Sequence, residues 1–181
     1  HLHIQQAIIG GESMGGYIAL AYTQQYPDKV VGLILADTQS IADDEGAKTK
    51  RETTAAEVLA NGTSKLIAGF LPKALTDHAP QATRAHLQTI LNEQTPTAVA
   101  SALRGMALRS DTSSVLAAIS LPVLVITGAK DNLVLPQQSE NMHKLAKNSK
   151  LVVIADGAHL ANLEQPDEWN QAVVEMFEQV L

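Results

Sequence analysis

A serine flanked by glycines follows an apolar segment near the start of the chain, in Gly11-Glu12-Ser13-Met14-Gly15. This pattern is typical of a sharp turn from a strand into a helix that exposes a nucleophilic serine hydroxyl, and small residues are needed where the turn crowds the backbone. A glycine-rich phosphate turn would instead require a Lys followed by Ser or Thr, or a third glycine at dinucleotide spacing, and the segment has neither. We therefore interpret Ser13 as a nucleophile.

A serine hydroxyl needs a base to accept its proton and a third group to orient that base. Among the six histidines, His159 directly follows an apolar segment, and the carboxyl ends of parallel strands are where catalytic groups gather. We therefore predict that His159 is the general base. The other histidines precede the first expected strand or lie in expected helices and connections, and we expect them on the surface: His1, His3, His78, His86 and His143.

A carboxylate that could orient His159 follows another apolar segment, in Thr127-Gly-Ala-Lys-Asp131. Asp131 gives the chain order Ser, Asp, His, and we favour it as the acid. Asp37 directly follows the apolar segment Val30–Ala36. It is an alternative candidate for the acid, or a turn or capping residue. Glu12 and Glu164 are interpreted as loop or supporting groups, without a catalytic role.

Short runs rich in Val and Ile predict strands buried on both faces of a parallel sheet: Ile4–Ile9, Val30–Ala36, Pro122–Gly128 and Leu151–Ala155. Helical patterns alternate with them over Met14–Gln25, over Pro136–Lys147 and after Pro166. The last helix carries an apolar face of Trp169, Val173, Met176, Phe177 and Val180. The alternation predicts an α/β fold, a parallel sheet flanked by helices.

The connection from Asp37 to Leu121 is far longer than the dozen or so residues that a parallel crossover needs. It contains patterns for helices over Asp43–Ala60, Ser64–Phe70, Pro80–Glu93 and Pro96–Arg109, separated by Asn61-Gly62, Pro72 and Thr95-Pro96. We interpret residues 39–115 as a helical cap and residues 1–38 and 116–181 as the core; extra scaffolding is the alternative reading. Phe70, Leu71, Met106 and Leu108 could line an apolar pocket or form the interior of the cap.

The composition is that of an ordinary globular chain of 181 residues with 45% hydrophobic residues. Its net charge of -6 and the lack of a basic run disfavour nucleic-acid binding, and its lack of cysteine excludes disulfides and thiolate chemistry. No apolar run is long enough to span a membrane. We expect a cytoplasmic protein that needs no metal or organic cofactor.

Three separated segments resemble the α/β-hydrolase superfamily: Gly11–Gly16, Leu121–Asp131 and Gly157–Pro166. The last of these and the run Gly105–Asp111 most resemble 3-oxoadipate enol-lactonases and related small esterases. The resemblance implies a serine hydrolase of esters or lactones that acts through an acyl-enzyme. It also implies that the Met14 backbone N–H is one oxyanion donor.

The same resemblance implies further strands before His1, one loop of which supplies the second oxyanion donor, so we expect a partial fold with its N-terminal strands absent. A partner chain or a homo-oligomer could then supply what is missing. Two other functions stay open: a non-catalytic remnant that binds a ligand or partner, and a cofactor-free perhydrolase or haloperoxidase.

Overall fold

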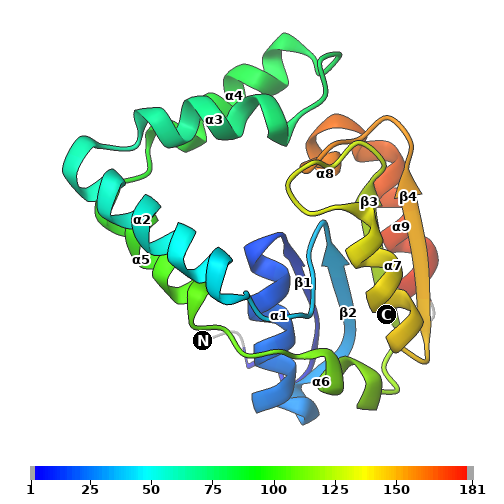
Figure 1. Ribbon diagram of the computed structural model, residues 1–181. Coiled ribbons are helices and arrows are strands. Elements are labelled where there is room, and N and C mark those ends of the chain that lie inside the picture. Colours follow the sequence, from blue (N-terminus) through cyan, green and yellow to red (C-terminus); the bar gives the residue numbers. More distant parts are fainter. Residues whose placement is uncertain (1–2, 179–181) are drawn as a thin grey trace.

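A computed structural model describes residues 3–178, in which four parallel strands form one sheet in the order β1-β2-β3-β4 (Figure 1). The ladder pairs Glu12 with Ala36, Ala36 with Ile126, and Gly128 with Ile154, so the carboxyl ends of all the strands lie at one edge of the sheet. The predicted parallel sheet is confirmed. The strands are β1 (Ala7–Glu12), β2 (Val30–Ala36), β3 (Val123–Gly128) and β4 (Ser149–Ile154).

Two predictions about the strands are wrong in detail. The first strand was expected at Ile4–Ile9 but runs from Ala7 to Glu12, because its glycines Gly10 and Gly11 pair with Ile34 and Leu35 of β2 and extend the ladder up to Ser13. All strands were expected to be buried on both faces, yet only β3 is buried along its whole length. In the described part of the chain β1 and β4 lie at the two ends of the sheet and are partly exposed.

Helices cover both faces of the sheet, as the alternating pattern predicted. On one face, α1 (Met14–Gln25), α6 (Ser113–Ala118) and α7 (Pro136–Leu145) enclose a core that includes Leu20, Leu33 and Val125. On the other face, α9 (Pro166–Phe177) packs Phe177 against Ile126 and Ile154. The expected apolar face of α9 is seen from Trp169 to Phe177, while Val180 lies outside the described residues. The sheet is therefore packed between two apolar layers, one on each face.

Four helices of the insertion between β2 and β3 extend beyond the carboxyl edge of the sheet (Figure 1). Helix α2 packs along α5, and α3 packs against α4. Gly62, with φ of 82°, ends α2 as its sequence suggested. Pro72 does not separate helices as expected: it lies inside α3, in the last turn before the helix ends at Ala74. The helices are α2 (Glu45–Asn61), α3 (Ser64–Ala74), α4 (Gln81–Asn92) and α5 (Pro96–Ala107).

The remaining elements are a short 3-10 turn, η1 (Pro27–Lys29), and one helical turn, α8 (Ala161–Glu164), which follows the His159 loop. Helix α6 contacts α1 and α7, so the expected boundary between residues 115 and 116 falls inside a helix that packs with the sheet layer. In the described range, no helix has the length and apolar character to cross a membrane.

Candidate active site

The turn between β1 and α1 places Ser13 at the carboxyl edge of the sheet in a strained conformation. Its φ of 52° and ψ of -113° lie outside the regions that non-glycine residues normally adopt. A Cβ on Gly11 would lie 2.0 Å from the carbonyl oxygen of Gly15, so only glycine fits there. The Ser13 N–H donates to the carbonyl of Ala36 at 2.8 Å, and the Thr38 hydroxyl donates to the Ser13 carbonyl at 2.7 Å. Contacts from the neighbouring strand thus hold the strained turn in place.

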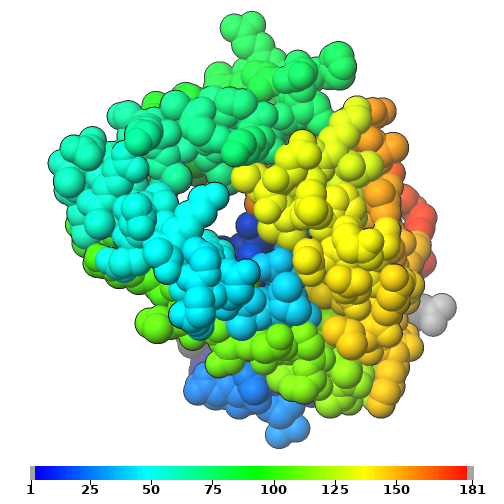
Figure 2. All heavy atoms as spheres, viewed as in Figure 1, coloured from blue at the N-terminus to red at the C-terminus, as the bar shows by residue number. Residues whose placement is uncertain are grey.

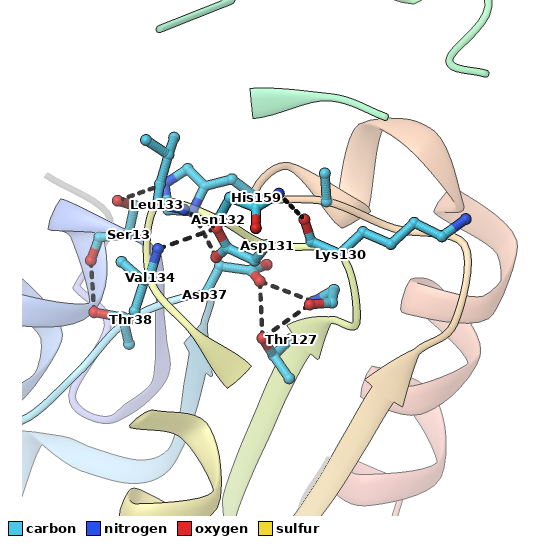
Figure 3. A network of polar contacts seen from close by, with 12 residues as sticks. Ser13, Asp37, Thr38, Thr127, Lys130, Asp131, Asn132, Leu133, Val134 and His159 are labelled. Atoms are coloured by element: carbon cyan, nitrogen blue, oxygen red, sulfur yellow. Dashed lines mark hydrogen bonds and ion pairs between the residues drawn. The ribbon is translucent and has the colours of Figure 1, made fainter. Parts of the chain in front are cut away.

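Ser13, His159 and Asp131 form one hydrogen-bonded chain at this edge (Figure 3). The Ser13 Oγ lies 2.9 Å from His159 Nε2, and His159 Nδ1 lies 2.8 Å from Asp131 Oδ2. Because an ionised carboxylate only accepts hydrogen bonds, it favours the tautomer with the proton on Nδ1, which leaves Nε2 free to accept from the serine hydroxyl. The three residues that the sequence placed at the ends of different strands are therefore brought together.

The Asp131 carboxylate is fixed from its other side by backbone donors. Its Oδ1 accepts from the N–H groups of Leu133 at 2.7 Å and Val134 at 3.0 Å, and the whole residue is 2% exposed. His159 is equally buried, and its ring meets Phe70 of α3 edge to face, with the centroids 6.3 Å apart. The imidazole is thus held between a fixed carboxylate and an aromatic ring from the insertion.

Asp37, the alternative acid, lies beside Asp131 and makes no hydrogen bond to the imidazole (Figure 3). Its Oδ1 accepts from the Gly128 N–H at 2.8 Å and from the Thr127 hydroxyl at 3.1 Å. The residue is fully buried and has a φ of 44°. Burial, reinforced by the negative charge of Asp131, raises its pKa to about 8 although the bonds from Gly128 and Thr127 oppose the shift.

Glu12 adds a third buried carboxyl group near Asp37 and Asp131. Both of its carboxyl oxygens are buried, and neither has a hydrogen-bond partner among the described residues. Burial, together with the charges of Asp37 and Asp131, raises the pKa of Glu12 to about 10. The raised pKa favours the neutral form of Glu12, and the supporting role that we expected for it stays a prediction.

Glu164 links the loop that carries His159 to the helical insertion. Its Oε1 accepts from the backbone N–H of Thr76 at 2.8 Å and from the Thr76 hydroxyl at 2.5 Å, and its Oε2 accepts from the Ala158 N–H at 2.8 Å. The Leu160 N–H donates to the carbonyl of Ala74 at 3.0 Å beside this link. The residues on both sides of His159 are therefore tied to the end of α3.

Replacing Glu164 by Gln is expected to lower the free energy of unfolding by about 1–3 kcal/mol, because one amide NH2 would then face a buried donor that needs an acceptor. Urea denaturation at pH 7 measures the change. Glu168→Gln, on the exposed start of α9, serves as the matched control and should stay within about 0.5 kcal/mol of wild type. Equal unfolding free energies of the two variants would show that the hydrogen bonds of Glu164 do not stabilise the fold.

A cavity of about 500 Å³ opens above Ser13 and His159, between the sheet edge and the insertion helices. Figure 2 shows the hollow between the cyan α2 segment and the yellow segment that follows β3. Phe70 and Met106 line the cavity as expected. Leu71 packs in the interior of the insertion with Leu75 and Leu87, which was the second of the two expectations for it. Leu108 meets neither expectation, because it follows the end of α5 and is 84% exposed.

Arg51 of α2 gives the cavity a charged wall. Its guanidinium pairs with Asp43, which also pairs with Arg109 at 2.7 Å. Although burial opposes ionisation of Asp43, hydrogen bonds and positive charge from both arginines hold its pKa below the ordinary value. Two arginines share one carboxylate, which leaves a net positive charge. The Arg51 Nη1 donates to a weak acceptor, the Sδ of Met106, at 3.3 Å.

Sequence reasoning missed Thr38, Thr127 and Arg51. Thr38 and Thr127 each stand at the end of a strand, and that position was the available signal. Arg51 lies in a helix with no apolar stripe, and only its neighbours in space reveal its place in the cavity. Of the histidines expected on the surface, His3, His78 and His86 are exposed and His143 is half-buried, while His1 lies outside the described residues.

Comparisons with known proteins agree with this geometry. The family described as alpha/beta hydrolase fold matches residues 1–166, so the chain belongs to this family. It is 35% identical over 163 residues to pimeloyl-[acyl-carrier protein] methyl ester esterase of Neisseria meningitidis, covering 84% of this chain and 62% of that protein. It is 28% identical to 3-oxoadipate enol-lactonase 1 of Acinetobacter baylyi, covering 94% and 63%.

Among solved structures, a thermophilic esterase from Thermogutta terrifontis with malate bound superposes with a TM-score of 0.92 and 33% identity, covering 97% of this chain and 66% of that one. The chain is therefore similar to an esterase and an enol-lactonase within the alpha/beta hydrolase fold family, the superfamily that its sequence resembles. It spans about 62% of the length of the esterase that it matches at 35% identity.

Proposed function

We propose that the chain is the catalytic part of a serine hydrolase of carboxylic esters or lactones, with Ser13 as nucleophile, His159 as general base and Asp131 as the acid. The observation that carries the proposal is the hydrogen-bonded chain of these residues at the floor of a largely apolar cavity. The similarity to a methyl ester esterase and an enol-lactonase supports the same reaction class. The helices over residues 45–107 act as the cap that encloses the substrate.

In the proposed reaction, Ser13 Oγ attacks the ester carbonyl carbon while its proton moves to His159 Nε2. Asp131 stabilises the imidazolium that results. The Met14 N–H, in the first turn of α1, has no partner within its helix and donates to the oxyanion. His159 then gives its proton to the leaving alkoxide as the acyl-enzyme forms. Water, which gives a proton to His159 Nε2, attacks the acyl carbon; the bond to Ser13 Oγ breaks, Oγ takes the proton back, and the carboxylic acid is released. These steps need neither a metal nor an organic cofactor.

The shape and charge of the cavity favour an acyl chain that carries an anionic group. Most of the side chains that line the cavity are apolar. Among residues 3–178, Arg51 supplies the positively charged side chain of this lining. A guanidinium binds a carboxylate through paired hydrogen bonds that a neutral group cannot match. We therefore infer that a hemiester or a lactone with a free carboxylate is preferred over a neutral ester.

Replacing Arg51 by Gln is expected to raise KM for monomethyl adipate about 10- to 100-fold, because a hydrogen bond to a charged group is lost. KM for neutral methyl hexanoate should change by about twofold or less, since its chain end has no charge to bind. Steady-state kinetics with both esters measures the difference.

Arg104→Gln provides the matched control. Arg104 is on α5, pairs with Glu52 at 2.7 Å and is exposed outside the cavity, so its loss should leave both KM values near those of wild type. A parallel rise of KM for both esters in Arg51→Gln would indicate a disturbed cap, and an unchanged KM for both would exclude the anionic substrate class.

A fluorophosphonate probe tests the proposed chemistry itself. It should label Ser13 stoichiometrically, because only a serine activated by a base reacts readily with such a phosphonylating agent. Peptide mapping by mass spectrometry identifies the labelled residue. A chain that stays unlabelled while folded would support the alternative of a non-catalytic ligand-binding remnant.

A further inference from the structure

The carboxyl groups of Asp37 and Asp131 face each other in the buried space behind His159 (Figure 3). Asp131 has donors on both oxygens: two backbone N–H groups on Oδ1 and the imidazole on Oδ2. Asp37 has donors on Oδ1 alone, and its buried Oδ2 has no donor among the described residues. The two carboxyl groups therefore differ sharply in how well their negative charge is stabilised.

Titratable groups that face Asp37 are acidic. Glu12 approaches from β1 and Asp131 from the connection after β3, while the hydrogen bond of His159 is to Asp131 Oδ2. Two carboxylates packed together in a buried space cannot both stay ionised, so the pair retains one proton. Asp131 has three donors that stabilise negative charge, whereas Asp37 has donors on one oxygen alone, so the geometry favours the proton on Asp37. Burial keeps the pKa of Asp37 at about 8, in agreement with this distribution.

We propose that Asp37 is a positioning residue, a neutral carboxylic acid whose Oδ2–H donates a hydrogen bond to the Asp131 carboxylate and holds it toward His159. The inference rests on the proposed function of this site. The bond fixes the carboxylate from behind, while the imidazole binds it from the front. It also gives the unpartnered Oδ2 a partner that an ionised Asp37 would lack.

A pair of substitutions separates this role from that of a triad acid. Asp37→Asn keeps an N–H donor at the same place, and Asn tolerates the φ of 44°, so kcat should stay within about fivefold of wild type. Asp37→Ala leaves the Gly128 N–H without its acceptor and Asp131 without its donor, so kcat should fall about 10- to 100-fold with little change in KM.

The pH dependence of stability gives a readout that does not need activity. A carboxyl whose pKa is raised on folding contributes stability that is present below its unfolded value near 4 and is lost as the pH rises through its folded value of about 8. Asp37→Asn removes this loss. The unfolding free energy of Asp37→Asn minus that of wild type should therefore rise steadily from pH 4 to pH 8. Urea denaturation across this range measures the difference.

Asp111→Asn is the matched control for the pH series. A hydrogen bond from the Ser113 N–H at 2.8 Å lowers the pKa of exposed Asp111, so removing its charge should give a difference that does not grow from pH 5 to pH 8. Infrared spectroscopy adds a direct signature: the carbonyl stretch of a protonated acid should weaken in Asp37→Asn relative to wild type at pH 6.

The proposal is overturned if Asp37→Asn loses as much activity as Asp131→Asn, because Asp37 would then act as the ionised acid. It is also overturned if Asp37→Asn and Asp37→Ala behave alike, or if Asp37→Asn leaves the carboxylic acid band unchanged. If the chain hydrolyses no ester at all, the proposed function fails, whereas the infrared and stability measurements still decide the protonation of Asp37.

Discussion

Replacing Ser13 by Ala is expected to reduce kcat for p-nitrophenyl acetate by about 10⁴-fold or more, since no other group in the proposed mechanism can form the acyl-enzyme. The oxyanion donor and the cavity stay in place, so the residual rate should still exceed that in buffer. The initial burst of p-nitrophenol, which reports acylation, should disappear. Stopped-flow absorbance measures both the burst and the steady rate.

Ser114→Ala is the control for this change, because Ser114 is an exposed residue of α6, away from the cavity. It should match wild type in burst and in steady rate. Ser13→Ala and wild type should also unfold at similar urea concentrations, because the substitution keeps a Cβ at the strained position. Equal turnover by Ser13→Ala and wild type would remove Ser13 from the mechanism.

The parts of the site that sequence could predict are those tied to strand ends. Apolar runs predict parallel strands, and because the carboxyl ends of parallel strands share one edge, residues that follow such runs are expected to meet. Ser13, Asp131 and His159 follow three of these runs, and the structure places them within hydrogen-bond distance. Their catalytic roles stay predictions.

Other parts depend on contacts that no local pattern encodes. Whether Asp37 or Asp131 binds the imidazole follows from loop geometry, since the Asp131 loop turns back so that its own backbone donors fix the carboxylate. The Glu164 link joins residues that are 88 positions apart. The start of β1 was misplaced because pairing with β2, rather than hydrophobicity, sets where that strand begins and ends.

Coupling between the cap and the site follows from the same contacts. Phe70 meets the His159 ring, and Glu164 ties Thr76 of the insertion to Ala158, next to His159. A displacement of α3 would therefore change the position of the imidazole through both contacts. If the proposed function holds, substitutions of Phe70 or Thr76 are expected to change kcat as well as KM, because these two residues contact His159 or the loop that carries it.

Replacing Asp131 by Asn is expected to lower kcat by about 10⁴-fold at pH 7, through the tautomer of His159. The backbone donors of Leu133 and Val134 require an oxygen at the Oδ1 position. The Asn amide must therefore turn its NH2 toward His159 Nδ1, which can accept that bond only when the imidazole proton is on Nε2. Nε2 would then donate to Ser13 instead of accepting its proton.

The tautomer can be observed directly, because the nitrogen-15 chemical shifts of His159 distinguish a protonated Nδ1 from a protonated Nε2. Wild type should carry the proton on Nδ1, and Asp131→Asn should carry it on Nε2. Asp156→Asn, an exposed residue on the same edge that pairs with Lys130 at 2.8 Å, should keep the wild-type tautomer and rate. If Asp131→Asn keeps more than about a tenth of the wild-type kcat, another group orients His159, and Asp37 becomes the acid to test.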